Sequence, residues 1–154
     1  MAIKKLKIGI IGCGAIGSNL AVILKDKYAD RVVLAAFCDL EETRARALRQ
    51  RVKSGVATTL AGAIAKSDLV VEAASGQVSY DIASRALAKG KDVLVMSIGG
   101  ILGREKKLFQ IASRQKARLL FPSGAIAGID GIKAMSVAGI RSVASAPHHH
   151  SFEY

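Results

Sequence analysis

The chain has 154 residues, of which 51% are hydrophobic and 15 are glycine, and its formal net charge is +11. A chain of this length and apolar content can bury the core of one domain, which excludes a disordered protein. No apolar run approaches the roughly 20 residues that span a bilayer, and Met1–Lys7 lacks a signal-peptide pattern. We therefore expect a cytoplasmic protein without a membrane partner.

The stretch Lys7–Gly17 (KIGIIGCGAIG) joins a short apolar run to three glycines in a G-x-G-x-x-G pattern. The run predicts a buried parallel strand, and residues 15–27 are expected to form the helix after it. In this pattern Gly12 makes the tight turn, Gly14 lets the backbone approach a pyrophosphate, and Gly17 lets the helix pack closely on the strand. The helix N-terminus then directs its N–H groups and the positive end of its dipole at the phosphates.

A second apolar strand, residues 32–38, is followed by Asp39, which lies 22 residues after Gly17 (39 − 17). This spacing is close to the ~20 residues expected for the carboxylate that holds the adenosine ribose. Asp39 favours NAD because a carboxylate repels a 2′-phosphate, whereas Arg44 or Arg46 could accommodate that phosphate, so NADP stays open. The alternative is a glycine-rich turn without a ligand and an aspartate that only caps a helix.

Helices and strands alternate along the rest of the chain. We expect helices over residues 41–53, 60–66, 77–89 and 103–116, and strands over residues 55–59, 69–74, 92–96 and 117–121. This alternation predicts an α/β fold with right-handed crossovers. The fold class expected is a Rossmann-type doubly wound parallel sheet with helices on both faces.

Small and polar residues follow two of the expected strands, at positions 73–76 and 97–100. Ligands of doubly wound sheets bind at the carboxyl ends of the strands, so these positions leave room for the nicotinamide half of a dinucleotide. Glu72 is unusual in an apolar strand, and a carboxylate satisfied by backbone donors is favoured over a catalytic one. Cys13 and Cys38 lack metal-ligand spacing, so we predict no metal site and reduced thiols.

The positive charge does not by itself indicate a nucleic-acid partner. Basic residues are spread over several expected helix faces, without interleaved aromatic residues or a recognisable reading helix. We interpret the charge as solvated surface and expect no nucleic-acid partner. A basic nucleic-acid binder would show a steeply salt-dependent affinity for DNA.

Four segments together make the chain resemble the L-aspartate dehydrogenase family. They are the glycine turn, VVEAAS at residues 70–75, VMSIGG at 95–100 and FPSGAIAGIDGIKAMSVAGI at 121–140, of which the last is the most specific. The resemblance implies that Ser123, Gly124 and Ala125 contact the nicotinamide side of the cofactor. Similar N-terminal domains occur in homoserine dehydrogenases, which keeps that family as an alternative.

The resemblance implies a two-domain enzyme that oxidatively deaminates aspartate to iminosuccinate with NAD or NADP and can feed NAD biosynthesis. Its second domain, an α+β unit, binds the substrate carboxylates and supplies a catalytic histidine, and no position here matches that histidine. We therefore expect a dinucleotide-binding domain at residues 1–140, with residues 141–154 a remnant or altered start of the substrate domain and a frayed tail. For His148, His149 and His150 we favour a solvated tail over a catalytic or metal-binding role.

The leading hypothesis is the cofactor domain of an amino-acid dehydrogenase, inactive or nearly so alone, whose substrate would be aspartate or a similar small amino acid. The alternative is a stand-alone dinucleotide-binding or redox-sensing module. Faces that would meet a second domain predict a homo-oligomer. The candidate cofactor contacts are Gly12, Cys13, Gly14, Ala15, Ile16, Gly17, Asp39, Leu40, Ala74, Ser75, Ser97, Ile98, Gly99, Ser123, Gly124 and Ala125.

Overall fold

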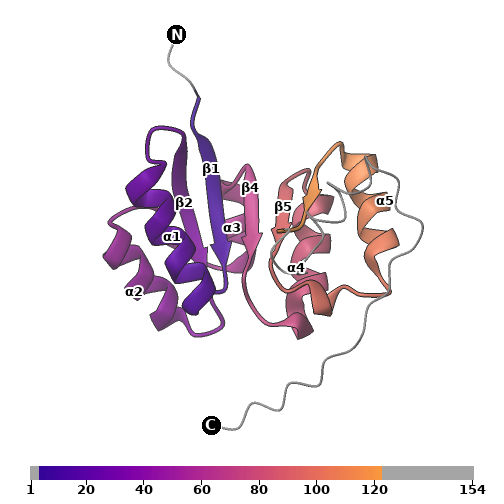
Figure 1. Cartoon of the computed structure of the whole chain (residues 1–154), viewed down its shortest axis with the longest axis horizontal. Coiled ribbons are helices and arrows are strands. Elements are labelled where there is room, and N and C mark those ends of the chain that lie inside the picture. Colours follow the sequence, from indigo (N-terminus) through magenta and orange to yellow (C-terminus); the bar gives the residue numbers. More distant parts are fainter. Residues whose placement is uncertain (1–3, 123–154) are drawn as a thin grey trace, which may run out of the picture. The chain divides into compact units, whose positions relative to one another are not determined.

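Six parallel strands form one sheet in the computed structural model, which describes residues 4–122 (Figure 1). The strands are β1 (Leu6–Ile11), β2 (Val32–Cys38), β3 (Val56–Ala57), β4 (Leu69–Glu72), β5 (Asp92–Val95) and β6 (Leu119–Leu120). Their order across the sheet is β3-β2-β1-β4-β5-β6. The chain first builds outward from β1 through β2 and β3 and then crosses to the other side of β1. The topological switch point therefore lies between β1 and β4, where doubly wound sheets bind their ligands.

Helices connect the strands and cover both faces of this sheet. They are α1 (Ala15–Lys27), α2 (Glu42–Val52), α3 (Leu60–Lys66), α4 (Gly76–Ala88), the 3₁₀ turn η1 (Ile98–Gly100) and α5 (Glu105–Gln115). Figure 1 shows the helices beside the sheet. Buried side chains of α1 and α2 pack on one face of the sheet, and those of α3, α4 and α5 pack on the other. This arrangement confirms the predicted fold class.

Alternation along the strands divides the core into two clusters. Ile8 and Ile10 of β1 pack with buried residues of α1 and α2, whereas Ile11 packs with those of α3 and α4. The pairing of β1 with β2 carries an irregularity just after Ile8. As a result Leu34 and Phe37, three residues apart on β2, both join the cluster on the α1–α2 face. The sheet is thus covered on both faces, which explains why its strands read as near-continuous apolar runs.

The expected elements of the described chain all occur, with differences at their ends. Residues 15–27 and 32–38 form a helix and a strand as expected. Within residues 4–122, β3 and β6 are the outermost strands and each pairs with one neighbour. Both are shorter than expected, at two residues each, as is common for edge strands. The expected helix 103–116 begins at Glu105, since Gly103 has a φ of +77°, which a right-handed helix cannot contain.

Several predictions fall outside the described residues. They include the domain boundary at residue 140 and the histidine tail at 148–150, which stay predictions. The described residues belong to one unit, Met1–Pro122. Among residues 4–122, no helix is both long and apolar enough to cross a membrane.

Gly9 of β1 faces the end of α3, where a side chain would not fit. A Cβ at this position would overlap Ser67 Oγ and lie 3.2 Å from the carbonyl oxygen of Ala63. We expect Gly9→Ala to lower the free energy of unfolding by about 1–3 kcal/mol through overpacking, as measured by urea denaturation. Gly99→Ala is the control, because no atom lies within 4 Å of the added Cβ, and its effect should stay within about 0.5 kcal/mol.

The Gly9→Ala cost should also shrink in a Ser67→Ala background, because the overlapping hydroxyl is then gone. An equal cost in both backgrounds would contradict this packing.

Candidate functional site

The turn from β1 into α1 is shaped by close contacts of the backbone. Gly12 has a φ of +95°, a left-handed conformation that favours glycine. Its N–H donates to the carbonyl of Cys38 at 2.8 Å, and a Cβ on it would overlap the backbone of Ala73 and Ala74. The turn therefore touches both the end of β2 and the segment after β4, and only glycine fits at its first position.

The other two glycines of the pattern serve different purposes. A Cβ on Gly17 would overlap the carbonyl oxygen of Gly12 and lie 3.2 Å from Ile10 Cγ2, so α1 packs directly on the turn and on β1. A Cβ on Gly14, by contrast, would have no atom within 4 Å. Gly14 is the N-cap of α1, whose first turn has no acidic residue and no side-chain cap. Open space in front of uncapped helix N–H groups is the arrangement that binds a phosphate.

Asp39 joins the end of β2 to the glycine turn. Its Oδ2 accepts the N–H of Cys13 at 2.6 Å, and its Oδ1 accepts the N–H of Glu41 at 2.9 Å. Each carboxylate oxygen has two lone pairs, so both oxygens keep capacity for a ligand hydroxyl. Leu40, the next residue, is fully exposed with a relative accessibility of 103%. The N-cap of α2 is Glu41 and no side chain caps this helix, so the carboxylate of Asp39 holds the turn and is not a helix cap.

Arg44 and Arg46, which could accommodate the 2′-phosphate of NADP, both form ion pairs with neighbouring glutamates. Arg44 Nη2 lies 2.8 Å from Glu41 Oε1, and Arg46 Nη2 lies 2.7 Å from Glu42 Oε1. All four side chains are more than half exposed, so these pairs add little stability and can open.

Cys13 and Cys38 lie at the ends of the neighbouring strands β1 and β2, and both are free thiols. The Cys13 thiol is buried and donates to the carbonyl of Cys38, with 3.6 Å between sulfur and oxygen. Burial, followed by the negative charge of Asp39, raises the pKa of Cys13 to about 12 and also raises that of Cys38. Both thiols stay protonated at neutral pH and are poor nucleophiles.

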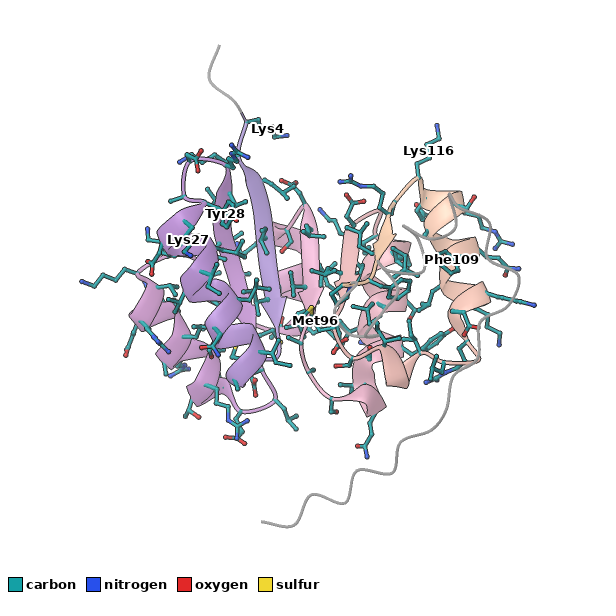
Figure 2. The ribbon with its side chains drawn as sticks, viewed as in Figure 1. Lys4, Lys27, Tyr28, Met96, Phe109 and Lys116 are labelled. Atoms are coloured by element: carbon teal, nitrogen blue, oxygen red, sulfur yellow. The ribbon has the colours of Figure 1, made fainter. Side chains whose placement is uncertain are left out.

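The ends of β4 and β5 form the second part of the site. Ser97 Oγ donates to the carbonyl of Ala74 at 2.9 Å, which ties the segment after β5 to the segment after β4. Glu72 is fully buried and accepts the N–H groups of Ala74 and Ser97. The interpretation of Glu72 as a carboxylate satisfied by backbone donors is confirmed. Met96, labelled in Figure 2, lies at the end of β5 and packs against the cluster on the α1–α2 face.

Sequence reasoning missed Ser79 of α4, whose hydroxyl donates to Glu72 Oε2 at 2.8 Å. The signal was present in the sequence, because Ser79 precedes Ile82, Ala83 and Ala86 at helical spacing and all four are buried. A serine on the buried face of a helix needs an internal partner.

The structure therefore brings most of the candidate residues to the carboxyl edge of the sheet. Gly12 through Gly17, Asp39 and Leu40 surround the ends of β1 and β2, and Ala74, Ser75, Ser97, Ile98 and Gly99 follow β4 and β5. Ser123, Gly124 and Ala125 lie outside the described residues. The uncapped helix N-terminus, the open space at Gly14 and the carboxylate of Asp39 fit the phosphates and a ribose of a dinucleotide.

Fold and site together define a nicotinamide-dinucleotide-binding domain of a dehydrogenase. Residues 12–122 match the family described as "Homoserine dehydrogenase, NAD binding domain", and the chain belongs to this family. NAD is accordingly its cofactor, as predicted.

Known proteins support the same conclusion. The chain is 40% identical over 142 residues to an L-aspartate dehydrogenase of Methanosarcina barkeri, a match that covers 90% of this chain and 52% of that protein. The NAD complex of GenD2 from gentamicin A biosynthesis has a TM-score of 0.69 and 25% identity, covering 92% of this chain and 41% of GenD2. A homoserine dehydrogenase of Thiobacillus denitrificans shares the fold, with a TM-score of 0.72, 21% identity and coverage of 87% and 33%. The resemblance to L-aspartate dehydrogenases is confirmed, and the chain spans about half the length of these curated relatives.

Proposed function

We propose that this chain provides the cofactor site for the oxidative deamination of L-aspartate to iminosuccinate. The observation that carries the proposal is the 40% identity to an L-aspartate dehydrogenase over 90% of this chain. That match spans 52% of the relative, so the proposal assigns the binding of the amino acid to groups beyond the matched half. We also propose that the protein works in the cytoplasm, that its product feeds NAD biosynthesis and that it forms a homo-oligomer.

The site residues divide between the two halves of the cofactor. The N–H groups of Gly14, Ala15 and Ile16 at the start of α1 bind the pyrophosphate. Asp39 accepts hydroxyls of the adenosine ribose, and the exposed Leu40 packs on the adenine. On the other side of β1, the residues after β4 and β5 hold the nicotinamide half, and Ser123, Gly124 and Ala125 complete it within a domain that extends over residues 1–140.

In this proposal, the domain orients the cofactor. When bound, NAD accepts a hydride from the α-carbon of the amino acid. The turn at Gly12 and the segments after β4 and β5 fix where the nicotinamide lies. This fixed orientation lowers the entropic part of the barrier of a bimolecular reaction. The reaction also needs a base for the amine proton and cations for two substrate carboxylates, roles that the proposal gives to no residue among 4–122.

Two other functions have support. The family to which residues 12–122 match is described as the NAD-binding domain of homoserine dehydrogenase, which favours homoserine as an alternative substrate. A stand-alone NAD-binding module needs only the residues already described. We also propose NADP as an alternative cofactor. The ion pairs of Arg44 and Arg46 are exposed, so they can open and leave the guanidinium groups free to bind a 2′-phosphate.

Two alanine variants of the glycine turn, Gly12→Ala and Gly14→Ala, distinguish an effect on folding from an effect on NAD binding. The Cβ of Gly14→Ala meets no protein atom, so its melting temperature should equal that of the wild type. The same Cβ enters the space of the pyrophosphate, so calorimetry should give an NAD affinity at least about tenfold lower, or about 1.4 kcal/mol. Gly12→Ala should instead fail to fold, because its Cβ overlaps Ala73. Unchanged NAD binding by Gly14→Ala would place the pyrophosphate elsewhere.

Asp39→Ala tests the ribose contact. Loss of hydrogen bonds to a charged acceptor should weaken NAD about ten- to a hundredfold. NADP should lose less, because the charge that repels its 2′-phosphate is also removed, so the preference for NAD narrows. Titration calorimetry with both dinucleotides measures this, and Asp30→Ala, which removes an exposed carboxylate between α1 and β2, is the matched control. Unchanged selectivity in Asp39→Ala would rule out the ribose contact.

A chimera tests the reaction itself. In the chimera, the residues of this chain that match the Methanosarcina barkeri enzyme replace the corresponding half of that enzyme. The formation of NADH by the chimera is then measured with aspartate and with homoserine as substrates. We expect the chain alone to bind NAD without turnover and the chimera to oxidise aspartate. A chimera that binds NAD as the chain does, yet forms no NADH with aspartate, would favour the stand-alone module.

A further inference from the structure

Glu72, the last residue of β4, brings a carboxylate into the interior at a relative accessibility of 0%. Burying a carboxylate is costly unless donors surround it. Its Oε1 accepts the N–H of Ala74 at 2.8 Å, and its Oε2 accepts the hydroxyl of Ser79 at 2.8 Å and the N–H of Ser97 at 3.2 Å. The donors come from three places, namely the segment after β4, the helix α4 and the segment after β5.

Further contacts hold these three places together around the carboxylate. The N–H of Met96 donates to the backbone carbonyl of Glu72 at 2.9 Å, and the hydroxyl of Ser97 donates to the carbonyl of Ala74. The start of α4 and η1 meet backbone to backbone, since a Cβ on Gly100 would overlap Gly76. These contacts join the two segments to each other, and the carboxylate of Glu72 links both of them to α4.

This unit lies on one side of the switch point only. The sheet order puts β4 and β5 on the side of β1 opposite to β2 and Asp39. In a doubly wound sheet, the two halves of a dinucleotide bind on the two sides of this point. We propose that Glu72 is a positioning residue for the nicotinamide half of the cofactor and leaves the adenosine half unaffected. The proposal rests on the assignment of the two halves given under the proposed function.

Glu72→Gln keeps the shape of the side chain and changes its hydrogen bonding. The amide has one acceptor oxygen, and its NH₂ group would face an N–H or O–H donor where Glu72 has a second acceptor. The probes are NADH and ADP, which lacks the nicotinamide and its ribose, each titrated by calorimetry. We expect Glu72→Gln to lower NADH affinity about tenfold and to change ADP affinity less than about twofold.

Two serine variants complete the experiment. Ser79→Ala removes one donor to Glu72 from a helix position outside the candidate cofactor contacts. It should shift the ratio of NADH affinity to ADP affinity in the same direction, by less. This variant carries the test if Glu72→Gln does not fold. Ser67→Ala is the matched control: Ser67 is also buried, and its hydroxyl donates to the carbonyl of Ala63 before β4 begins. Its ratio should equal that of the wild type.

The outcomes separate this inference from the proposed function. Equal losses of both affinities in Glu72→Gln would make Glu72 a structural residue and overturn the inference. So would an unchanged ratio in both Glu72→Gln and Ser79→Ala. If the wild type bound neither NADH nor ADP, the proposed function would fail and the inference with it.

Discussion

The site depends on how closely the backbone approaches itself where β1 turns into α1. Side chains at Gly12 and Gly17 would overlap backbone atoms, so the turn, the first turn of α1 and the segment after β4 touch without any side chain between them. This contact brings the N–H groups at the start of α1 to the carboxyl end of β1, next to the switch point. Gly14 has no such neighbour. The same pattern of glycines thus provides both tight packing and the free space that a pyrophosphate requires.

Two carboxylates stabilise the strand ends on either side of this turn, and their burial gives them different roles. Asp39 is half-buried and accepts one N–H on each oxygen, so it can hold the turn and a ribose at the same time. Glu72 is fully buried and accepts three hydrogen bonds from the protein. It can influence a ligand only through the segments that it holds. Accessibility, more than residue type, therefore determines which of the two carboxylates can contact a ligand directly.

Local patterns predicted the parts of the fold and site that local physics determines. The spacing of Gly12, Gly14 and Gly17 and the apolar runs of β1 and β2 indicated the first βαβ unit and Asp39, because each depends on neighbours in sequence. The 3₁₀ turn at residues 98–100 and the bond from Ser79 to Glu72 were not predicted. The 3₁₀ turn depends on the contact of Gly100 with Gly76, which is distant in sequence. The bond from Ser79 to Glu72 joins a helix to the end of a strand, and the apolar pattern of either element does not show it. The ion pair of Arg44 with Glu41 also escaped prediction, because exposed arginines have many partners of similar energy.

The chemistry of the candidate contacts separates cofactor binding from substrate selection. Among residues 4–122, the contacts proposed for the nicotinamide side are Ala74, Ser75, Ser97, Ile98 and Gly99, which carry no charge. The carboxylate of Glu72 is buried and accepts N–H groups of Ala74 and Ser97. Such an edge can hold a sugar and an aromatic amide through backbone groups and hydroxyls. A dicarboxylate needs cations in a fixed geometry, as arginine provides. Under the proposed function, specificity for aspartate therefore has to come from residues other than these contacts. NAD affinity alone cannot distinguish an aspartate dehydrogenase from a stand-alone module. Turnover of aspartate by the chimera can.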